Sequence, residues 1–240
     1  MAVVRIGTSG WHYPHWRGVF YPPTLAPTHY LDYYARHFGT VEINNSFYQL
    51  PGEAAFRQWR EAVPGGFVFA VKASSYITHR KKLRDPARTT PAFLARVRLL
   101  GNKLGPVLFQ LPPRWRADPE RLASFLSALP ADLACAFELR DPSWFNPRVE
   151  EILRSHRAAF CIYEFDWRLS PLSVTADFVY IRLHGPEGAY RGRYGRRRLQ
   201  PWAERITGWR QQDLTVYCYF DNDEAGYAVR DALELKDLLG

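Results

Sequence analysis

The sequence contains little cysteine and no paired-cysteine motif. Its only three cysteines are Cys135, Cys161 and Cys218, and each lies within an apolar run. None of them has the C-x-x-C spacing that is typical of zinc and redox sites. We therefore expect all three to be small buried residues of a protein from a reducing compartment, which favours the cytoplasm.

Long apolar runs are also absent. No stretch approaches the roughly 20 residues that a membrane-spanning helix needs, so we expect no membrane partner. The apolar start at Val3 and Val4 is interrupted by Arg5, which argues against a secretory signal. Linkers and low-complexity tracts are missing as well. The sequence thus favours a single domain over residues 1–240.

Histidine is scarce where a metal centre would need it. Of the seven histidines, only His184 and His79 fall at the end of a strand-like run. A metal centre of a barrel enzyme would require several histidine and aspartate ligands at strand ends. We therefore predict neither a metal nor another cofactor. A single cation held by Glu42, Glu138 and Asp221 is the alternative.

Acidic residues are outnumbered, and aromatic residues are abundant. The 32 Lys and Arg against 24 Asp and Glu give a net charge of +8, and aromatics make up 15% of the chain. This balance favours anionic partners such as phosphate esters, acidic sugars or nucleic acid. The competing interpretation is an arginine-rich, solvated surface without a partner.

Strand-like and helix-like segments alternate along the whole chain. The eight strand-like runs are Val3–Thr8, Thr40–Asn44, Phe67–Lys72, Pro106–Leu111, Leu133–Leu139, Ala159–Tyr163, Phe178–Leu183 and Leu214–Phe220. Helical patterns cover Pro27–His37, Glu53–Ala62, Pro91–Lys103, Pro119–Leu129, Asn146–Ser155, Pro201–Gln211 and Glu224–Leu239. Such alternation predicts an α/β protein with a closed parallel sheet, a TIM (β/α)8 barrel. Little helical signal lies between Tyr163 and Phe178, so the sixth helix should be short or missing.

Polar residues recur at the carboxyl ends of these strands. Alternate residues of a strand share a face. The polar ends that share a face with small or apolar alternates are Glu42 with Asn44, Lys72, Gln110, Glu138 with Arg140, and Arg182 with His184. In a barrel this face is the interior, and the carboxyl ends form the mouth where barrel enzymes keep their chemistry.

The side chains of this mouth suggest acid–base chemistry without a metal. Glu42 and Glu138 could serve as acid and base, and Lys72 or His184 as base or anion ligand. Binding of the ligand is assigned to Asn44, Gln110, Arg140, Arg182, Asn222, Trp11 and Tyr190. The alternative is a buried salt-bridge network with only a structural role.

Two loops next to the mouth, after the first and seventh strands, contain further candidate ligand-binding residues. Gly10 and Trp11 follow the first strand, and Trp11 with its aromatic neighbours could stack on a ligand or plug the barrel edge. After the seventh strand, Tyr190 precedes an arginine-rich segment with the cations Arg191, Arg193, Arg196, Arg197 and Arg198. This segment is predicted to be a mobile anion-binding loop over the mouth, or else a solvated charge run. Asp223 is expected to cap the last helix.

Ordered motifs along nearly the whole chain resemble the YecE-like proteins, known as domain of unknown function 72. The motifs are Ile6-Gly-Thr-Ser-Gly-Trp11, Val41-Glu-Ile-Asn-Asn-Ser-Phe-Tyr48, Phe109-Gln-Leu-Pro-Pro113, Phe137-Glu-Leu-Arg140, Arg182-Leu-His-Gly185 and Tyr217–Asp223. The resemblance implies a TIM barrel but no established reaction. Members of this family often have Asn where this chain has Asp221, and Asp where it has Glu164. The roles of Asp221, Glu164 and nearby Asp166 therefore stay open.

These observations favour a cofactor-independent barrel enzyme that acts on a small anionic or polyhydroxylated, sugar-like substrate. The alternative is a nucleic-acid-binding protein or phosphodiesterase, because the family is distantly similar to barrels of the endonuclease IV kind. Those relatives use metal, and this chain lacks their histidine-rich ligand set. A non-catalytic adaptor on a barrel scaffold is a third hypothesis. The oligomeric state is not readable from the sequence.

Overall fold

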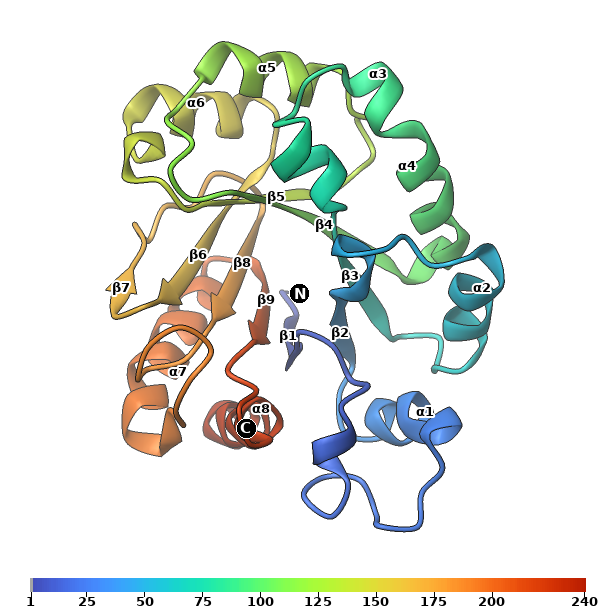
Figure 1. Ribbon diagram of the computed structural model, residues 1–240. Helices are drawn as coiled ribbons and strands as arrows, with labels where there is room; N and C mark the ends of the chain where they lie inside the picture. The colour runs from blue at the N-terminus through green and yellow to red at the C-terminus, as the bar shows by residue number, and fades with distance from the viewer. Residues whose placement is uncertain (1) are drawn as a thin grey trace.

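A computed structural model describes residues 2–240, which form a nearly closed barrel of eight parallel strands (Figure 1). The barrel strands are β1 (Val4–Thr8), β2 (Thr40–Ile43), β3 (Val68–Lys72), β4 (Leu104–Leu111), β5 (Cys135–Leu139), β6 (Ala159–Phe165), β8 (Phe178–Leu183) and β9 (Thr215–Phe220). They follow one another around the barrel in chain order. The predicted TIM-barrel fold is confirmed.

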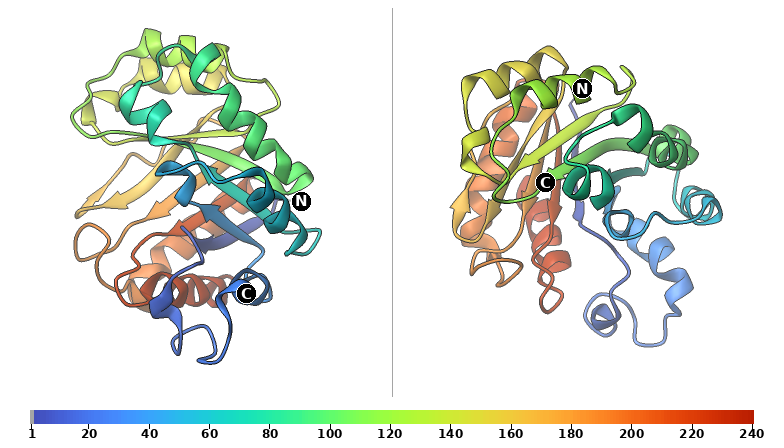
Figure 2. Two further views of the ribbon diagram at one scale, coloured as in Figure 1. Left: turned by 45° about the vertical axis from the view of Figure 1, so that its right-hand side comes forward. Right: turned by 45° about the horizontal axis from the view of Figure 1, so that its top comes forward.

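Helices cover the outside of the strands (Figures 1 and 2). The α-helices are α1 (Tyr30–Ala35), α2 (Glu53–Glu61), α3 (Pro86–Thr89), α4 (Pro91–Val97), α5 (Pro119–Ser127), α6 (Pro147–Ser155), α7 (Gly195–Gln211) and α8 (Tyr227–Leu239). Short helical turns are η1 (Pro14–Trp16), η2 (Pro27–His29), η3 (Asn45–Phe47), η4 (Tyr76–Arg80), η5 (Arg98–Lys103) and η6 (Pro142–Trp144).

Local sequence explains where several helices begin. Asp118 accepts a hydrogen bond from the backbone N–H of Arg121 at the start of α5, and Asn146 accepts one from Val149 at the start of α6. Each cap is followed by proline, whose missing N–H is one that a first helical turn leaves unpaired anyway.

No helix connects β6 to β8, as the sequence predicts. Instead β6 turns into the two-residue strand β7 (Arg168–Leu169), which pairs with it in antiparallel fashion. Asp166 and Trp167 make this turn with positive φ angles of 52° and 59°. An irregular segment then leads to β8, so the barrel is uncovered by helix at this one crossing.

The barrel closes between β1 and β2 by close backbone approach instead of a full ladder. Ser9 and Glu42 form an isolated parallel bridge, in which the backbone N–H of Gly10 donates to the Glu42 carbonyl at 2.8 Å. Gly7 permits this approach, because a Cβ there would lie 2.4 Å from the carbonyl oxygen of Thr40. A side chain at residue 7 would therefore force these two strands apart.

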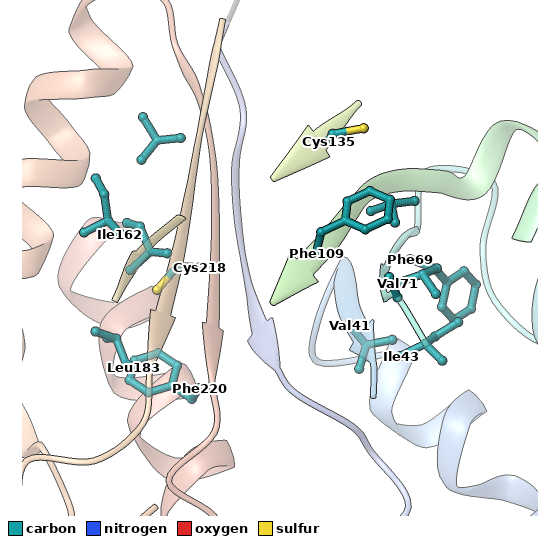
Figure 3. Packing of buried hydrophobic residues seen from close by; sticks show 14 of the residues in the cluster. Val41, Ile43, Phe69, Val71, Phe109, Cys135, Ile162, Leu183, Cys218 and Phe220 are labelled. Carbon is teal, nitrogen blue, oxygen red and sulfur yellow. The ribbon is translucent and has the colours of Figure 1, made fainter. Parts of the chain in front are cut away.

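Buried apolar residues form two clusters, one between the strands and the helices and one inside the barrel. The outer cluster joins strands to helices and includes Val41, Ile43, Phe69 and Phe109, which Figure 3 shows on their strands. The inner cluster is much smaller, and its buried members are Ala70, Leu108, Ala136, Ala159, Cys161, Phe178, Tyr180 and Tyr219. Residues that share the parity of this inner cluster therefore face the barrel axis, as the alternation of the sequence predicts.

The cysteines behave as expected, since all three are free and buried. Burial raises the pKa of Cys135 to about 12, which leaves its thiol unreactive at neutral pH. Within residues 2–240 there is no helix whose length and hydrophobicity suit a membrane crossing.

Candidate functional site

Arg182 of β8 lies at the centre of the polar cluster in the barrel mouth. Its side chain is fully buried and contacts three carboxylates from other strands. Nε and Nη2 donate to the two oxygens of Glu42 at 3.0 and 2.8 Å, and Nη1 donates to Glu138 Oε2 at 2.7 Å. Nη2 also lies 3.0 Å from Asp221 Oδ2. Burial alone would lower the pKa of Arg182, but these carboxylates raise it well above its ordinary value.

Glu42 of β2 is saturated with hydrogen bonds. Besides Arg182, Oε1 accepts from the Ser9 hydroxyl at 2.5 Å and Oε2 accepts from the Tyr180 hydroxyl at 2.7 Å. Both carboxylate oxygens thus have two donors each. Because Ser9 lies just beyond β1 and Tyr180 on β8, Glu42 ties three strands together at the point where the barrel closes.

Glu138 of β5 is equally enclosed. Oε1 accepts from Gln110 Nε2 at 2.7 Å and from Arg140 Nε at 2.6 Å, and it lies 3.5 Å from His184 Nε2. Burial alone would raise the pKa of Glu138, but Arg140 and Arg182 hold it well below its ordinary value. Glu138 is therefore ionised at neutral pH and carries no proton to donate.

Asp221 joins the cluster from the end of β9. One oxygen lies 3.0 Å from His184 Nδ1, so His184 sits between two carboxylates, Asp221 and Glu138. Burial would raise the pKa of Asp221, but Arg182, His184 and Lys72 together outweigh it and the pKa falls to about 2. This arrangement fixes the imidazole of His184, which is fully buried beneath the mouth.

Lys72 of β3 is the cation of the cluster that is not locked in place. Within residues 2–240, no carboxylate lies within 4.0 Å of its Nζ, which instead sits 4.2 Å from the centre of the Phe47 ring. Burial, assisted by the nearby charge of Arg182, lowers the pKa of Lys72 from 10.5 to about 8. Lys72 can therefore bind an anion or exchange a proton near neutral pH.

Arg140, just after β5, is a further cation of the cluster. Arg140 uses its Nε on Glu138, while its guanidinium stacks 4.2 Å from the Phe165 ring centre. Its two Nη atoms lie only 3.4 and 3.5 Å from the Tyr190 hydroxyl, which is a weak contact. The terminal nitrogens of Arg140 thus retain donor capacity.

Three of these charged residues, Lys72, Arg182 and Asp221, line a cavity of about 510 Å³ at the carboxyl ends of the strands. Its lining residues are Ser9, Gly10, Trp11, His12, Tyr13, Asn44, Asn45, Tyr48, Lys72, Arg182, Tyr190 and Asp221. Gly10 has a φ of 88° and would clash with Tyr13 if it carried a Cβ. Asn44 Nδ2 donates to the Tyr13 hydroxyl at 3.0 Å and to the Ser9 carbonyl at 3.1 Å, which holds this rim in place.

The structure brings most of the predicted site residues together. Glu42, Lys72, Glu138, Arg140, Arg182 and His184 form one cluster of contacts and mutual charge effects, with Gln110 beneath and Asn44 on the rim. Trp11 lines the cavity but is only 7% exposed and packs edge-on against Trp59, with ring centres 5.2 Å apart. Trp11 thus forms part of the cavity wall and also fills space at the edge of the barrel, so both predicted roles apply to it.

Asn222 was expected to contact the ligand, and the structure corrects this. Its Nδ2 donates to the carbonyl of Gly192 and to Asp231 Oδ2 of α8, at 2.9 and 2.8 Å. Asn222 has the parity of Phe220, which belongs to the outer cluster. The residue that faces the site from β9 is therefore Asp221.

The arginine-rich segment is not a loop throughout. α7 begins at Gly195, so Arg196, Arg197 and Arg198 form its first turns. The backbone N–H groups of Tyr194 and Gly195 donate to the buried carboxylate of Asp231, a negative group that stabilises a helix N-terminus.

Carboxylates outside the mouth engage several of these arginines. Arg196 pairs with Asp237 at 3.0 Å, Arg193 with Glu234 at 3.1 Å, and Arg198 lies 3.6 Å from Glu187. These arginines were expected over the mouth because the helix was predicted to start at Pro201. The exposed Arg191 precedes the helix, and none of the five arginines lines the main cavity.

Three further acidic residues do not line the main cavity. Asp223 does not cap α8, because that helix starts at Tyr227 and the carboxylate accepts from Trp16 Nε1 at 2.7 Å. Glu164 is the sixth residue of β6 and has outward parity, with Trp202 of α7 as its side-chain neighbour. Asp166 lies in the exposed turn to β7.

Three residues make contacts in this site that the sequence did not predict. Ser9 and Tyr13 follow β1, where no alternation marks them, and Asp221 was considered only as a ligand of the alternative single cation. Parity could have placed Asp221, since it shares the face of buried Tyr219. Among residues 2–240, no three His, Cys, Asp or Glu side chains form a group suited to a metal ion.

Comparison with known proteins gives a family match over almost the whole chain. The family model described as "Protein of unknown function DUF72" matches residues 5–240. UPF0759 protein YunF of Bacillus subtilis is 27% identical over 99% of this chain and 95% of its own length. UPF0759 protein YecE of Escherichia coli is 32% identical over 62% of this chain and 53% of its own length.

Solved structures of two family proteins have the same fold. A DUF72 family protein of Thermotoga maritima superposes with a TM-score of 0.88 at 29% identity and covers 99% of both chains. One from Enterococcus faecalis gives a TM-score of 0.83 at 20% identity, over 99% of this chain and 95% of its own.

Proposed function

Because the chain belongs to the DUF72 family of proteins of unknown function, its chemistry has to be inferred from the site, and we propose that it is an enzyme for a small anionic substrate bound at Lys72. The observation that carries this proposal is the amine of Lys72, which lines a cavity of about 510 Å³ and has a pKa of about 8. Perturbed groups in clefts are candidates for catalysis.

The charges around the cavity favour an anionic ligand over a neutral sugar. An anion at Lys72 would restore part of the solvation that its amine loses on burial, and Arg140 adds positive charge behind the lining residue Tyr190. Amide groups on the rim, from Oδ1 of Asn44 and from the exposed Asn45, would orient the rest of the substrate.

In this proposal the two glutamates position charge and do not transfer protons. Glu42 has no free lone pair for a substrate proton, and Glu138 stays ionised between Arg140 and Arg182. Lys72 is the proton donor or acceptor, since a pKa of about 8 lets it serve in either sense near neutral pH. His184 is held between Glu138 and Asp221 and supports the floor of the site.

A binding experiment with simple anions tests the proposal. Methyl phosphate and acetate should bind the wild-type protein, and Lys72→Met should weaken binding about 10- to 100-fold, the effect of one charged hydrogen bond. Calorimetric titration would measure it. Lys236→Met is the matched control, because burial lowers the pKa of Lys236 too but its amine donates to the His37 carbonyl outside the barrel.

Equal affinities of the wild-type protein and Lys72→Met for every bound anion would contradict the proposal. So would a loss of affinity in Lys236→Met as large as that in Lys72→Met.

Nucleic-acid binding is the second candidate, and a specific surface favours it. The loop after β3 carries Arg80, Lys81 and Lys82, none of which has a carboxylate within 4.0 Å in the part of the chain that the structure describes. Arg80 and Lys81 lie 5.5 and 5.7 Å from the ring of Tyr76, which is 40% exposed. Cations interleaved with an exposed aromatic suit a single strand.

Salt dependence would reveal such binding. If the β3 loop contacts about three phosphates, replacing Arg80, Lys81 and Lys82 by Ala should reduce the slope of log K against log salt by about 2 units for single-stranded DNA. Fluorescence anisotropy with a labelled oligonucleotide would measure it. The matched control is Ala at Arg196, Arg197 and Arg198, where two of the three arginines already have acidic partners. An unchanged slope in the β3 variant would refute this candidate.

A further inference from the structure

A second cavity of about 290 Å³ adjoins the main one. The two cavities share three lining residues, Trp11, His12 and Asn45. These three residues therefore form the border between them. The remaining walls of the second cavity come from the segment before α1 and from α2: Pro27, Thr28, Leu31, Gln58, Trp59 and Ala62.

The linings of the two cavities differ in chemistry. The main cavity contains Lys72, Arg182 and Asp221, whereas the second has no Lys, Arg, Asp or Glu among its walls. Trp11 and Trp59 supply aromatic surface, with their rings perpendicular at 5.2 Å. Such a wall is suited to a flat, neutral group and offers little to a second charge.

Polar groups at the border of the second cavity are exposed. Asn45, Gln58 and His12 are all exposed, and the amides of Asn45 and Gln58 each offer donors and an acceptor. A ring whose edge carries hydrogen-bonding groups would therefore find both stacking surface and polar partners here. A purely aliphatic chain would use only the indole surface.

We propose that the second cavity binds the neutral, ring-containing part of the substrate whose anionic group is held at Lys72. This rests on the proposed function and names its substrate class: an anionic group joined by a short linker to a flat ring with a polar edge. Trp11, shared by both cavities, lies at the junction between the two parts of the ligand.

Matched pairs of probes test this assignment. Benzyl phosphate should bind about tenfold more tightly than methyl phosphate, and phenylacetate more tightly than acetate, the gain expected of one added aromatic contact. The Ala62→Phe variant fills the second cavity, so it should abolish the gain from the ring and leave the affinity for methyl phosphate unchanged. Ala62 is exposed on the cavity wall, and an unchanged melting temperature would show that the variant folds.

Removal of the aromatic wall gives an independent check. Trp59→Ala should reduce the ratio of benzyl to methyl phosphate affinity, whereas Trp167→Ala should not, because Trp167 is 71% exposed in the turn after β6 and lines neither cavity.

The outcomes separate this inference from the proposed function. Methyl phosphate that binds through Lys72, with no gain from the ring or a gain that Ala62→Phe leaves intact, overturns the second cavity alone. Binding of neither phosphate nor carboxylate overturns both. Benzyl phosphate that binds in a way sensitive to Ala62→Phe but not to Lys72→Met supports the ring cavity and overturns the role of Lys72.

Discussion

Replacing Arg182 by Met should destabilise the protein by about 3–5 kcal/mol, the cost of leaving buried charges without their partner. Three carboxylates, Glu42, Glu138 and Asp221, contact this one fully buried guanidinium. For a chain of this size the loss corresponds to a fall in melting temperature of about 6–20 °C. Urea denaturation at pH 7.5 would measure it. Arg36→Met is the control, because Arg36 pairs with Asp32 on the surface, where such pairs contribute little.

The destabilisation should depend on pH with a definite sign. In the wild-type protein the pKa of Asp221 is lowered from 3.8 to about 2, so its contribution is fully present above pH 3.8 and disappears as the pH falls toward 2. Without Arg182, one lowering contribution is lost while burial still acts, so the pKa values of Glu138 and Asp221 rise from their wild-type positions. The variant then gains relative stability as the pH falls and they become protonated.

The difference between wild type and Arg182→Met should therefore shrink below about pH 5. Adding Glu42→Gln should also restore part of the lost stability at neutral pH, because Arg182 is the only cation that pairs with Glu42 among residues 2–240, so the change removes a charge that Arg182→Met leaves unpaired. A difference that stays the same from pH 7.5 to pH 4, or a loss under 1 kcal/mol, would show that Arg182 does not hold the network together.

The alternation of residues along the strands accounts for what could be predicted of the site. The inward positions that alternate with outer-core residues include Glu42, Lys72, Glu138 and Arg182. Because these residues are near the carboxyl ends of parallel strands, a barrel brings them together at one end. The same rule would have exchanged Asn222 for Asp221 in β9. In that strand the apolar run Tyr219-Phe220 conceals which residue faces inward, because both side chains are fully buried.

What the sequence could not show is which charges are engaged with one another. Glu42 and Glu138 are far apart in the chain, yet Arg182 joins them through one guanidinium. The sequence does not show whether these two carboxylates are bonded to Arg182 or free to exchange protons with a ligand. The packing of the strands around the guanidinium decides this. The arginines around the start of α7 were misplaced for a similar reason, since the partners of Arg193 and Arg196 lie on α8 and the capping carboxylate of Asp231 is distant in sequence.

Lys72 should titrate near pH 8 instead of near its ordinary value of 10.5. Labelling the lysines by reductive ¹³C-methylation and following their NMR signals with pH would measure this directly. The cause is burial, since Lys72 is only 8% exposed, reinforced by the charge of Arg182. A midpoint above 10 would contradict the role of Lys72 as the group whose protonation changes near neutral pH.

The lowered pKa determines how stability and binding respond to replacement of Lys72. In the folded protein the charged amine opposes folding below about pH 8, and this opposition fades as the pH rises to 10.5. Lys72→Met should therefore leave the melting temperature at pH 7 unchanged or raise it, while it weakens anion binding. A purely structural Lys72 would instead lower stability when replaced.

The Lys72→Arg variant keeps a positive charge at this position but does not lose it between pH 7 and pH 10. Wild-type affinity for methyl phosphate should be nearly constant from pH 7 to pH 8 and fall by up to tenfold per pH unit above pH 8, until the amine in the complex loses its proton as well. The ligand is already a dianion at these pH values, so the change belongs to the protein. With Arg at this position, any affinity that remains should stay constant from pH 7 to pH 10, because a guanidinium does not deprotonate there. A parallel decline in both proteins would assign the pH dependence to another group and remove Lys72 from the mechanism.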